Sequence, residues 1–285
     1  MRLAKRCVAC DKARLKHVPA VLMPFLSYRI FGWAPTRIEP EWGLRDLPSG
    51  MACSIAKTML CEDCGMLFLD MRFDDEEMAA LYDDYRGEAY ASQRESFEPG
   101  YTARNEKLLD GSKYLAAVEG FLSPYVSGRP SILDWGGDNG VNTPFRASAS
   151  RHHIFDISNR PPLDGARHVT RDEIKANSYD IVVCANVLEH VPHPRALAKE
   201  LASVMGPETT LYLEVPHEEV VRRFDDKEER LAHKRHWHEH INFFTQAALD
   251  AMLADAGLRV LDGVSLPITA GGKDSVVFSL AARRA

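Results

Sequence analysis

Apolar runs that end in acids and glycines divide the second half of this chain into segments with the length of β-strands. The run at 131–135 is followed at once by Gly136 and Gly137, which predicts a strand and then a tight turn. We expect the second strand of the unit to close at Asp156. An apolar run, a glycine turn and a second acid about one βαβ unit later predict a doubly wound α/β sheet with a nucleotide pocket at its edge.

Other segments show patterns of their own. Residues 73–85 carry apolar positions at helical spacing with acids in the first turn, which predicts a helix. A short strand is expected at 66–69, and a final β-hairpin at 258–264 and 274–280. Residues 18–50 form an insertion rich in apolar and aromatic positions near its start. We expect it to pack against the main domain, with a substrate-side flap or a membrane-facing patch as the alternatives.

The glycine loop predicts close approach of a ligand to the backbone. Gly136, Gly137 and Gly140 allow a tight reversal and positive φ angles. Their spacing departs from the GxGxxG pattern of dinucleotide-binding proteins, so NAD is not favoured. Asp156 would then accept hydrogen bonds from ribose hydroxyls.

Two downstream segments resemble one enzyme family. Residues 179–194, which read Tyr-Asp-Ile-Val-Val-Cys-Ala-Asn-Val-Leu-Glu-His-Val-Pro-His-Pro, are similar to the fourth strand and following turn of class I S-adenosylmethionine-dependent methyltransferases. Residues 211–216 are similar to the fifth strand of that family. With the glycine loop and residues 155–158, the resemblance covers about residue 130 to the C-terminus. It implies a Rossmann-like methyltransferase sheet, ending in the C-terminal β-hairpin, that binds S-adenosylmethionine.

The same resemblance implies which residues bind the cofactor. In this family the first-strand acid and the glycine loop hold the methionine and ribose part, and the second-strand acid binds the ribose hydroxyls. The implied cofactor-binding residues are Asp134, Gly136, Gly137, Gly140, Asp156 and Asn186. Asp138 stands where many relatives have a central glycine. Because aspartate enters the left-handed region more readily than most residues, we expect the turn to survive.

Composition limits the class of protein. At 285 residues and 45% hydrophobic content, the chain is long enough for one large domain and a small one. Its net charge of −6 argues against nucleic acid as a partner. We find no apolar stretch of roughly 18 residues to span a membrane and no apolar signal-peptide core. We therefore expect a cytoplasmic protein, in which reduced cysteines bind metal more readily than they form disulfides.

Four cysteines near the N-terminus have the spacing of a metal site. Cys7 with Cys10, and Cys61 with Cys64, form two knuckles that together complete a tetrahedral Zn²⁺ site of structural type. Cys53 is an alternative ligand or a buried small side chain. The zinc-binding domain, a zinc ribbon with the insertion, is expected at 1–72. A helical linker or lid is expected at 73–128 and the cofactor-binding domain at 129–285.

The segment from 233 to 245 concentrates histidines. Residues 237–240, Trp-His-Glu-His, resemble the Tyr-His-Glu-His motif of nucleotide-sugar C-methyltransferases, and 240–245 is similar to a segment shared among glycan-type methyltransferases. The resemblance implies His240 as general base, Glu239 as its orienting or substrate-binding partner, and Trp237 and His238 at the substrate. Metal binding by His236, His238 and His240 on one face of a strand is an alternative.

A zinc knuckle pair followed by a tyrosine-rich helix resembles the bacterial methyltransferases that modify polysaccharides and sugars. That resemblance implies that Tyr85 and Tyr90 line the mouth of the pocket, with helix packing as the alternative. Glu189, His190 and His217 are expected at strand ends that face the pocket, where capping is an equal alternative for His190.

The sequence therefore predicts an S-adenosylmethionine-dependent methyltransferase that acts on a small-molecule or glycan acceptor. We expect O-methylation of a sugar in a nucleotide sugar or a surface glycan. C-methylation of a keto-sugar is the alternative within the class, and the chain ends where sugar C-methylating relatives carry a further domain. From another class, a non-catalytic methyltransferase-like scaffold finds support in Asp138 alone.

Overall fold

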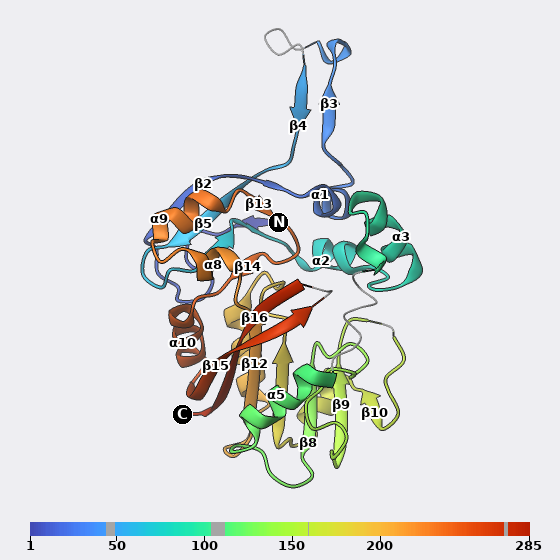
Figure 1. Ribbon diagram of the computed structural model, residues 1–285, viewed down its shortest axis with the longest axis vertical. Helices are drawn as coiled ribbons and strands as arrows, with labels where there is room; N and C mark the ends of the chain where they lie inside the picture. The colour runs from blue at the N-terminus through green and yellow to red at the C-terminus, as the bar shows by residue number, and fades with distance from the viewer. Residues whose placement is uncertain (44–48, 104–111, 159, 271–272) are drawn as a thin grey trace.

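The computed structural model describes residues 1–43, 49–103, 112–158, 160–270 and 273–285. The expected insertion at 18–50 and the expected linker at 73–128 each contain residues outside these ranges. A large sheet lies in the lower part of the molecule in Figure 1, a smaller sheet lies above it, and a narrow two-stranded arm projects from the top.

The large sheet has seven strands in the order β10-β9-β8-β11-β12-β16-β15. Its parallel strands are β8 (Ser131–Trp135), β9 (Arg151–Phe155), β10 (Ala166–His168), β11 (Ile181–Ala185) and β12 (Thr210–Pro216). The sheet ends in an antiparallel hairpin of β15 (Leu258–Ala270) and β16 (Lys273–Arg284). The predicted doubly wound sheet and C-terminal hairpin are thus both present, and the hairpin strands are longer than expected.

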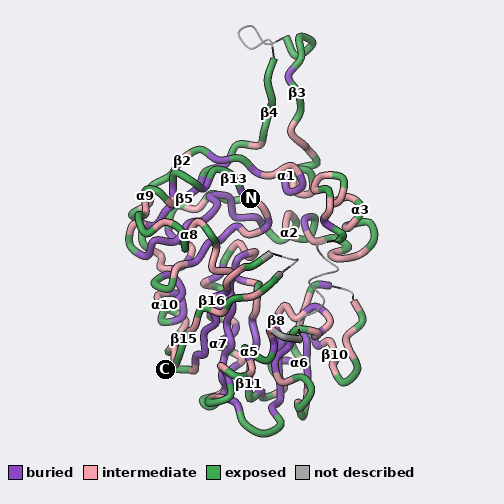
Figure 2. Tube along the Cα trace, viewed as in Figure 1, coloured by how far each residue is buried: buried purple, intermediate pink, exposed green. Residues whose placement is uncertain are grey.

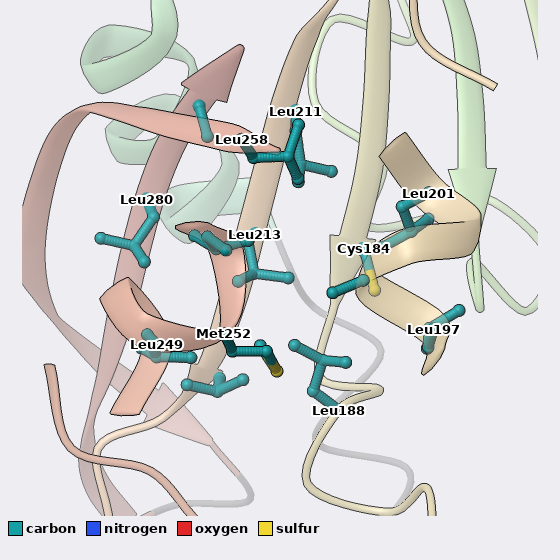
Figure 3. Close-up of a cluster of buried hydrophobic side chains, with 14 of the residues drawn as sticks. Cys184, Leu188, Leu197, Leu201, Leu211, Leu213, Leu249, Met252, Leu258 and Leu280 are labelled. Carbon is teal, nitrogen blue, oxygen red and sulfur yellow. The ribbon is translucent and has the colours of Figure 1, made fainter. Parts of the chain in front are cut away.

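Helices cover both faces of this sheet. One face carries α7 (Pro194–Ser203) and α10 (Gln246–Asp255), whose apolar side chains meet Cys184 of β11 and Leu211 and Leu213 of β12 (Figure 3). In α7 the buried positions recur every three or four residues, so one face of the helix is apolar. The opposite face of the sheet is covered by α5 (Ser112–Leu122) through Val118 and Leu122. A short helix, α6 (Arg171–Lys175), precedes β11.

The smaller sheet has five strands in the order β13-β2-β5-β6-β14. Its central strands are β2 (Leu15–Leu22), β5 (Ile55–Cys61) and β6 (Leu67–Leu69), and a two-stranded ladder joins β1 (Arg2–Leu3) to β7 (Met71–Arg72). The edge strands β13 (His236–Trp237) and β14 (Asn242–Phe243) come from the histidine-rich segment. A late segment of the chain therefore completes the N-terminal sheet.

The helices α1 (Pro24–Phe31), α2 (Asp75–Tyr82) and α3 (Glu88–Phe97) lie beside the smaller sheet (Figure 1). The predicted helix at 73–85 corresponds to α2, which starts with a capping box formed by Asp74 and Glu77. In the insertion, Phe25 and Leu26 are fully buried. After α1, the strands β3 (Thr36–Ile38) and β4 (Gly50–Ala52) and the short helix η1 (Pro40–Trp42) form the arm, which is largely exposed in Figure 2.

The helices α8 (Glu219–Arg223) and α9 (Lys227–His233) connect β12 to the histidine-rich segment. Among the described residues, no helix combines the length and the apolar character that a bilayer span requires.

Candidate functional site

Four thiols converge in the smaller domain. The Sγ atoms of Cys7, Cys10, Cys61 and Cys64 all lie within 4.8 Å of one another. Cys7 and Cys64 are 3.6 Å apart and Cys10 and Cys61 are 3.5 Å apart, too far for disulfides. A tetrahedral Zn²⁺ with bonds of about 2.3 Å would hold its sulfurs about 3.8 Å apart, so the thiols fit this ion. The predicted four-cysteine cluster is confirmed, and Cys53 is exposed outside it.

The glycine loop follows β8, where packing requires small residues. A Cβ added to Gly136 would collide with Cγ2 of Val187, and one added to Gly140 would lie 2.7 Å from the ring of His152. Both glycines have positive φ angles, +83° and +85°. The buried Asp134 carboxyl is hydrogen-bonded by the Thr143 hydroxyl, and burial raises the pKa of Asp134 to about 7. The loop is therefore held in shape by its protein neighbours.

Asp138 adopts the left-handed conformation that the turn requires, with φ of 54°. Its Oδ2 atom lies 2.9 Å from Arg86 and 2.7 Å from Arg160, and its Oδ1 atom accepts from the Ser158 hydroxyl at 2.9 Å. Two guanidinium groups thus compensate the charge of this nearly buried carboxylate. The Arg86 contact links the loop to the segment between α2 and α3.

Asp156 and Ile157 fit the adenosyl part of S-adenosylmethionine. The two carboxylate oxygens of Asp156 accept the backbone N–H groups of Asp138 at 2.8 Å and of Ser158 at 2.6 Å. Because a carboxylate accepts about four hydrogen bonds, lone pairs remain for two ribose hydroxyls. The adjoining Ile157 side chain is 68% exposed, which offers apolar surface beside the acid.

Asn186 directly follows β11 and has a left-handed conformation, with φ of 55°. Its side-chain amide donates to Glu214 on the neighbouring strand at 2.7 Å. The strained backbone turns the chain sharply toward Glu189 and His190. Asn186 therefore lies at the carboxyl edge of the sheet, where open α/β sheets bind their ligands.

His240 lies in the connection between β13 and β14, and its partners come from distant segments. Its Nδ1 atom is 2.7 Å from Oε1 of Glu218, which follows β12. Its ring centroid is 4.8 Å from that of His190 in an edge-on arrangement. Burial lowers the pKa of His240, but Glu218, Glu189 and Glu239 outweigh it and leave that pKa raised. The arrangement supplies an oriented imidazole whose pKa lies above its usual value.

Glu189 and His190 lie beside this imidazole. Glu189 is 1% exposed, and among the described residues neither of its carboxylate oxygens has a hydrogen-bond partner. Burial raises the pKa of Glu189 to about 7. Burial and the neighbouring His240 lower the pKa of His190 to about 3, so that its ring is neutral.

Glu239 is held in place from α3. Tyr90 donates its hydroxyl to Glu239 at 2.5 Å, and Arg94 forms an ion pair with it at 2.7 Å. Burial raises the pKa of Glu239, but Arg94 and the two neighbouring histidines leave it lowered. Glu239 is therefore a charged, fixed acceptor of hydrogen bonds.

The other residues expected at the substrate, Trp237, Tyr85 and His238, differ in burial and in hydrogen-bond partners. Trp237 is fully buried, and its indole N–H donates to Thr58 at 2.8 Å. Tyr85 packs edge-on against Tyr90, with ring centroids 5.4 Å apart. His238 accepts the backbone N–H of Glu239 at 2.8 Å and pairs with Glu98 through Nε2. A strand running from His236 to His240 is not formed, since β13 ends at Trp237.

A cavity of about 270 Å³ opens beside these groups. It is lined by Arg94, Glu218, Lys234, His238, Glu239, His240 and Phe243. Six of these seven side chains are polar or charged, so the cavity suits a compact, hydroxyl-rich ligand. Of the residues expected at the substrate, His238 lies on the cavity wall, whereas Trp237, Tyr85 and Tyr90 are not among its lining.

Asn242 forms side-chain hydrogen bonds that link separate segments of the site. Its side-chain amide donates to the carbonyls of Leu188 at 2.8 Å and Val191 at 2.7 Å, and its Oδ1 atom accepts from Arg72 at 2.8 Å. The Glu189–His190 turn and the His240 segment are thereby bound to each other.

Sequence reasoning missed Glu218, Arg94 and Lys234. Glu218 follows the carboxyl end of a parallel strand, and that position could have identified it. Arg94 and Lys234 carry no local signal, since each meets the cavity only through tertiary packing.

Comparisons with known proteins bear on the family and the fold of this chain. Residues 103–262, more than half of the chain, match a family model described as a methyltransferase domain. The structure is similar to 1,6-didemethyltoxoflavin-N1-methyltransferase from Burkholderia thailandensis, at 14% identity and a TM-score of 0.51, over 79% of this chain and 97% of that one. It is also similar to magnesium protoporphyrin IX methyltransferase from Synechocystis PCC 6803, at 16% identity and a TM-score of 0.47, over 74% and 100% of the chains.

No match to this chain is found among curated proteins. The family match and the similarity to the Burkholderia structure confirm the predicted fold class, a methyltransferase sheet with a C-terminal hairpin.

Proposed function

This chain belongs to the methyltransferase domain family, and from that premise we propose that it methylates a sugar hydroxyl in a nucleotide sugar or a surface glycan. The protein is an S-adenosylmethionine-dependent methyltransferase. When bound, S-adenosylmethionine supplies a methyl group activated by the positive sulfur. Asp134, Gly136, Gly137, Gly140, Asp156 and Asn186 form the proposed cofactor site.

The pairing of Glu218 with His240 at the cavity wall carries the proposal. Because Nδ1 donates to Glu218, the Nε2 atom of His240 remains free to accept the proton of an incoming hydroxyl. A positioned base of this kind accelerates proton transfer by about 100-fold to 10,000-fold. Glu239 would accept a hydrogen bond from a neighbouring hydroxyl and so orient the sugar.

The charges on the cavity wall support a sugar attached to an anionic group. Glu218, Glu239 and His240 supply acceptors for hydroxyl protons, whereas Arg94 and Lys234 supply cations. A phosphate of a nucleotide sugar could pair with these cations, since charged hydrogen bonds are the strong ones. Of the residues proposed to bind the substrate, only His238 would contact it directly. Tyr90 would act through its hydrogen bond to Glu239, and Tyr85 and Trp237 would act through packing.

C-methylation of a keto-sugar remains the second candidate, because it needs the same base beside a fixed carboxylate. There His240 would remove a proton from carbon instead of oxygen. An enzyme that methylates carbon would exchange hydrogen at that sugar carbon in heavy water without cofactor, whereas an enzyme that methylates oxygen would not.

We also propose that the four-cysteine cluster binds a structural Zn²⁺, because the spacing of the four sulfurs suits this ion. In this proposal residues 1–72 form the zinc-binding domain, residues 73–128 a helical lid, and residues 129–285 the cofactor-binding domain.

The test is methyl transfer from labelled S-adenosylmethionine to a panel of nucleotide sugars and free sugars, with products identified by mass spectrometry. We expect an O-methylated sugar from the wild-type protein and a turnover about 100-fold to 10,000-fold lower for His240→Ala. His17→Ala, which changes an exposed histidine on β2, is the matched control and should retain full turnover. Unchanged turnover of His240→Ala would remove His240 from the mechanism.

A further inference from the structure

Glu189, His190 and His240 bring three metal-binding atoms together, and of these residues His240 lines the cavity. One carboxylate oxygen and one nitrogen of each ring lie within 4.8 Å of one another. Glu189 and His190 follow β11, and His240 lies between β13 and β14, so the group joins two separate segments. It is distinct from the cluster of four thiols.

The two segments are fixed to each other by backbone hydrogen bonds. The N–H groups of Ile241 and Asn242 donate to the carbonyl of Glu189 at 2.8 and 3.1 Å. The side chain of Asn242 binds the same turn on both sides. The three side chains are therefore presented by a built framework, as a metal site requires.

The remaining ring nitrogens of both histidines are engaged by oxygen acceptors. Nδ1 of His190 lies 3.2 Å from the carbonyl of Glu239 and 3.1 Å from the hydroxyl of Tyr82. Because the carbonyl can only accept, we assign the hydrogen to this nitrogen, with the Tyr82 oxygen as a second acceptor. Nδ1 of His240 lies 2.7 Å from the carboxylate of Glu218. In the neutral rings both Nε2 atoms then keep their lone pairs, and Nε2 of His190 is 3.7 Å from Glu189. Histidines that bind metals are oriented in this way.

Glu189 supplies independent support for a cation. Its carboxylate is almost completely buried, and neither oxygen has a hydrogen-bond partner among the described residues. An uncompensated carboxylate in such a place is costly, because it has lost its hydration and gained no partner. A metal cation held between the carboxylate and the two Nε2 atoms would compensate it.

The donor set indicates the class of ion. Two imidazoles and one carboxylate bind Zn²⁺, Fe²⁺ or Mn²⁺ and leave coordination positions open. Thiolates prefer softer ions, so Mn²⁺ distinguishes this group from the four cysteines.

We propose that Glu189, His190 and His240 bind a divalent transition-metal ion whose open positions take two adjacent hydroxyl oxygens of the acceptor. The inference rests on the proposed function for its acceptor, and it makes the substrate class a sugar with a vicinal diol. The metal lowers the pKa of a bound hydroxyl, as it does for bound water. With the ion present, His240 is a ligand, and the ion replaces it in promoting loss of the proton.

The chemical step balances without a further reactant. The O–H bond of one coordinated hydroxyl breaks, the electron pair stays on oxygen, and the proton passes to solvent water. That oxygen then bonds to the methyl carbon as the bond from carbon to sulfur breaks, with its electron pair left on sulfur.

The decisive measurement is the number of Mn²⁺ ions bound by full-length protein that carries one equivalent of zinc per chain, which the four thiolates take in preference. The electron paramagnetic resonance signal of free Mn²⁺ monitors this binding. We expect one Mn²⁺ per chain, and an affinity at least about tenfold weaker for Glu189→Gln and for His190→Gln. His17→Ala should bind Mn²⁺ as the wild type does. Thermal unfolding of each variant shows whether it is folded, and Glu189→Gln removes a buried charge without changing its shape.

No bound Mn²⁺, or binding that Glu189→Gln leaves unchanged, would overturn the site. Turnover on a vicinal-diol sugar that is unaffected by removing the bound ion would overturn its role at the acceptor. A protein that binds Mn²⁺ through these residues but methylates no sugar would contradict the proposed function and support the metal site. The two proposals therefore fail in different measurements.

Discussion

His240 and Glu218 are paired at the cavity wall, with Nδ1 of the histidine 2.7 Å from Oε1 of the glutamate. The pair fixes both the orientation of the ring and the nitrogen that carries its hydrogen. Whether Nε2 then accepts a proton or binds a metal ion, its position depends on Glu218.

Loss of Glu218 should therefore reduce turnover without abolishing methyl transfer. We expect Glu218→Ala to lower kcat by about 10-fold to 100-fold, the usual cost of losing a carboxylate that orients a histidine. Steady-state kinetics with a methylated sugar as product measure this. Glu219→Ala changes the adjacent exposed glutamate and should leave kcat unchanged. Equal losses in both variants would point to a disturbed α8 instead.

Asp156→Ala should weaken S-adenosylmethionine binding by about tenfold or more, because a charged hydrogen bond contributes about 1.5 to 3 kcal/mol. Calorimetric titration with S-adenosylmethionine and S-adenosylhomocysteine measures the effect. Asp164→Ala, at an exposed aspartate in the turn before β10, should bind as the wild type does. Undiminished binding by Asp156→Ala would place the ribose elsewhere.

Gly136→Ala should destabilise the fold more than Gly128→Ala does. Both glycines have positive φ angles, but an added Cβ collides with Val187 only at position 136. The strained backbone costs about 1 to 3 kcal/mol at either position, and the collision adds to it at Gly136. Urea unfolding of the two variants gives the difference, and equal free energies of unfolding would contradict the close approach of Val187 to the glycine loop.

Lys234 should make acceptor binding depend on pH. Burial lowers the pKa of Lys234 to about 8, partly offset by Glu218, so its ammonium is charged below pH 8 and neutral above it. For an anionic acceptor we expect KM to rise as the pH passes through about 8. The KM of Lys234→Gln should be high at every pH in this range. A wild-type KM that stays constant from pH 7 to 9 would remove Lys234 from acceptor binding.

Removal of the proposed zinc should unfold the smaller domain. Structural zinc contributes about 10 to 16 kcal/mol in zinc-finger peptides, so its loss outweighs the stability of a small sheet. Zinc content and circular dichroism before and after chelation measure the effect, and Cys64→Ser should reproduce it. The exposed Cys53 provides the control, since Cys53→Ser should keep its zinc. A chelated protein with unchanged unfolding would show that the thiols need no metal.

The local patterns of the sequence determined much of the fold. The strand at 131–135, its glycine turn and the paired cysteine knuckles were predictable, because each depends on residues close together in the chain. Asp138 also behaved as its side chain allows, with a left-handed turn. The partners of its carboxylate could not be predicted from the sequence, since Arg86 and Arg160 reach it from other segments.

Only the tertiary structure decided which groups meet at the cavity. The histidine-rich segment gave no sign that His236–Trp237 and Asn242–Phe243 would become the edges of an N-terminal sheet. That pairing stops the strand before His238, buries Trp237, and sets His240 beside Glu218 and Glu189. The sequence by itself determined the chemical groups and the local turns, whereas contacts between residues far apart in the chain determined their partners, because hydrogen bonds and burial depend on distance in space.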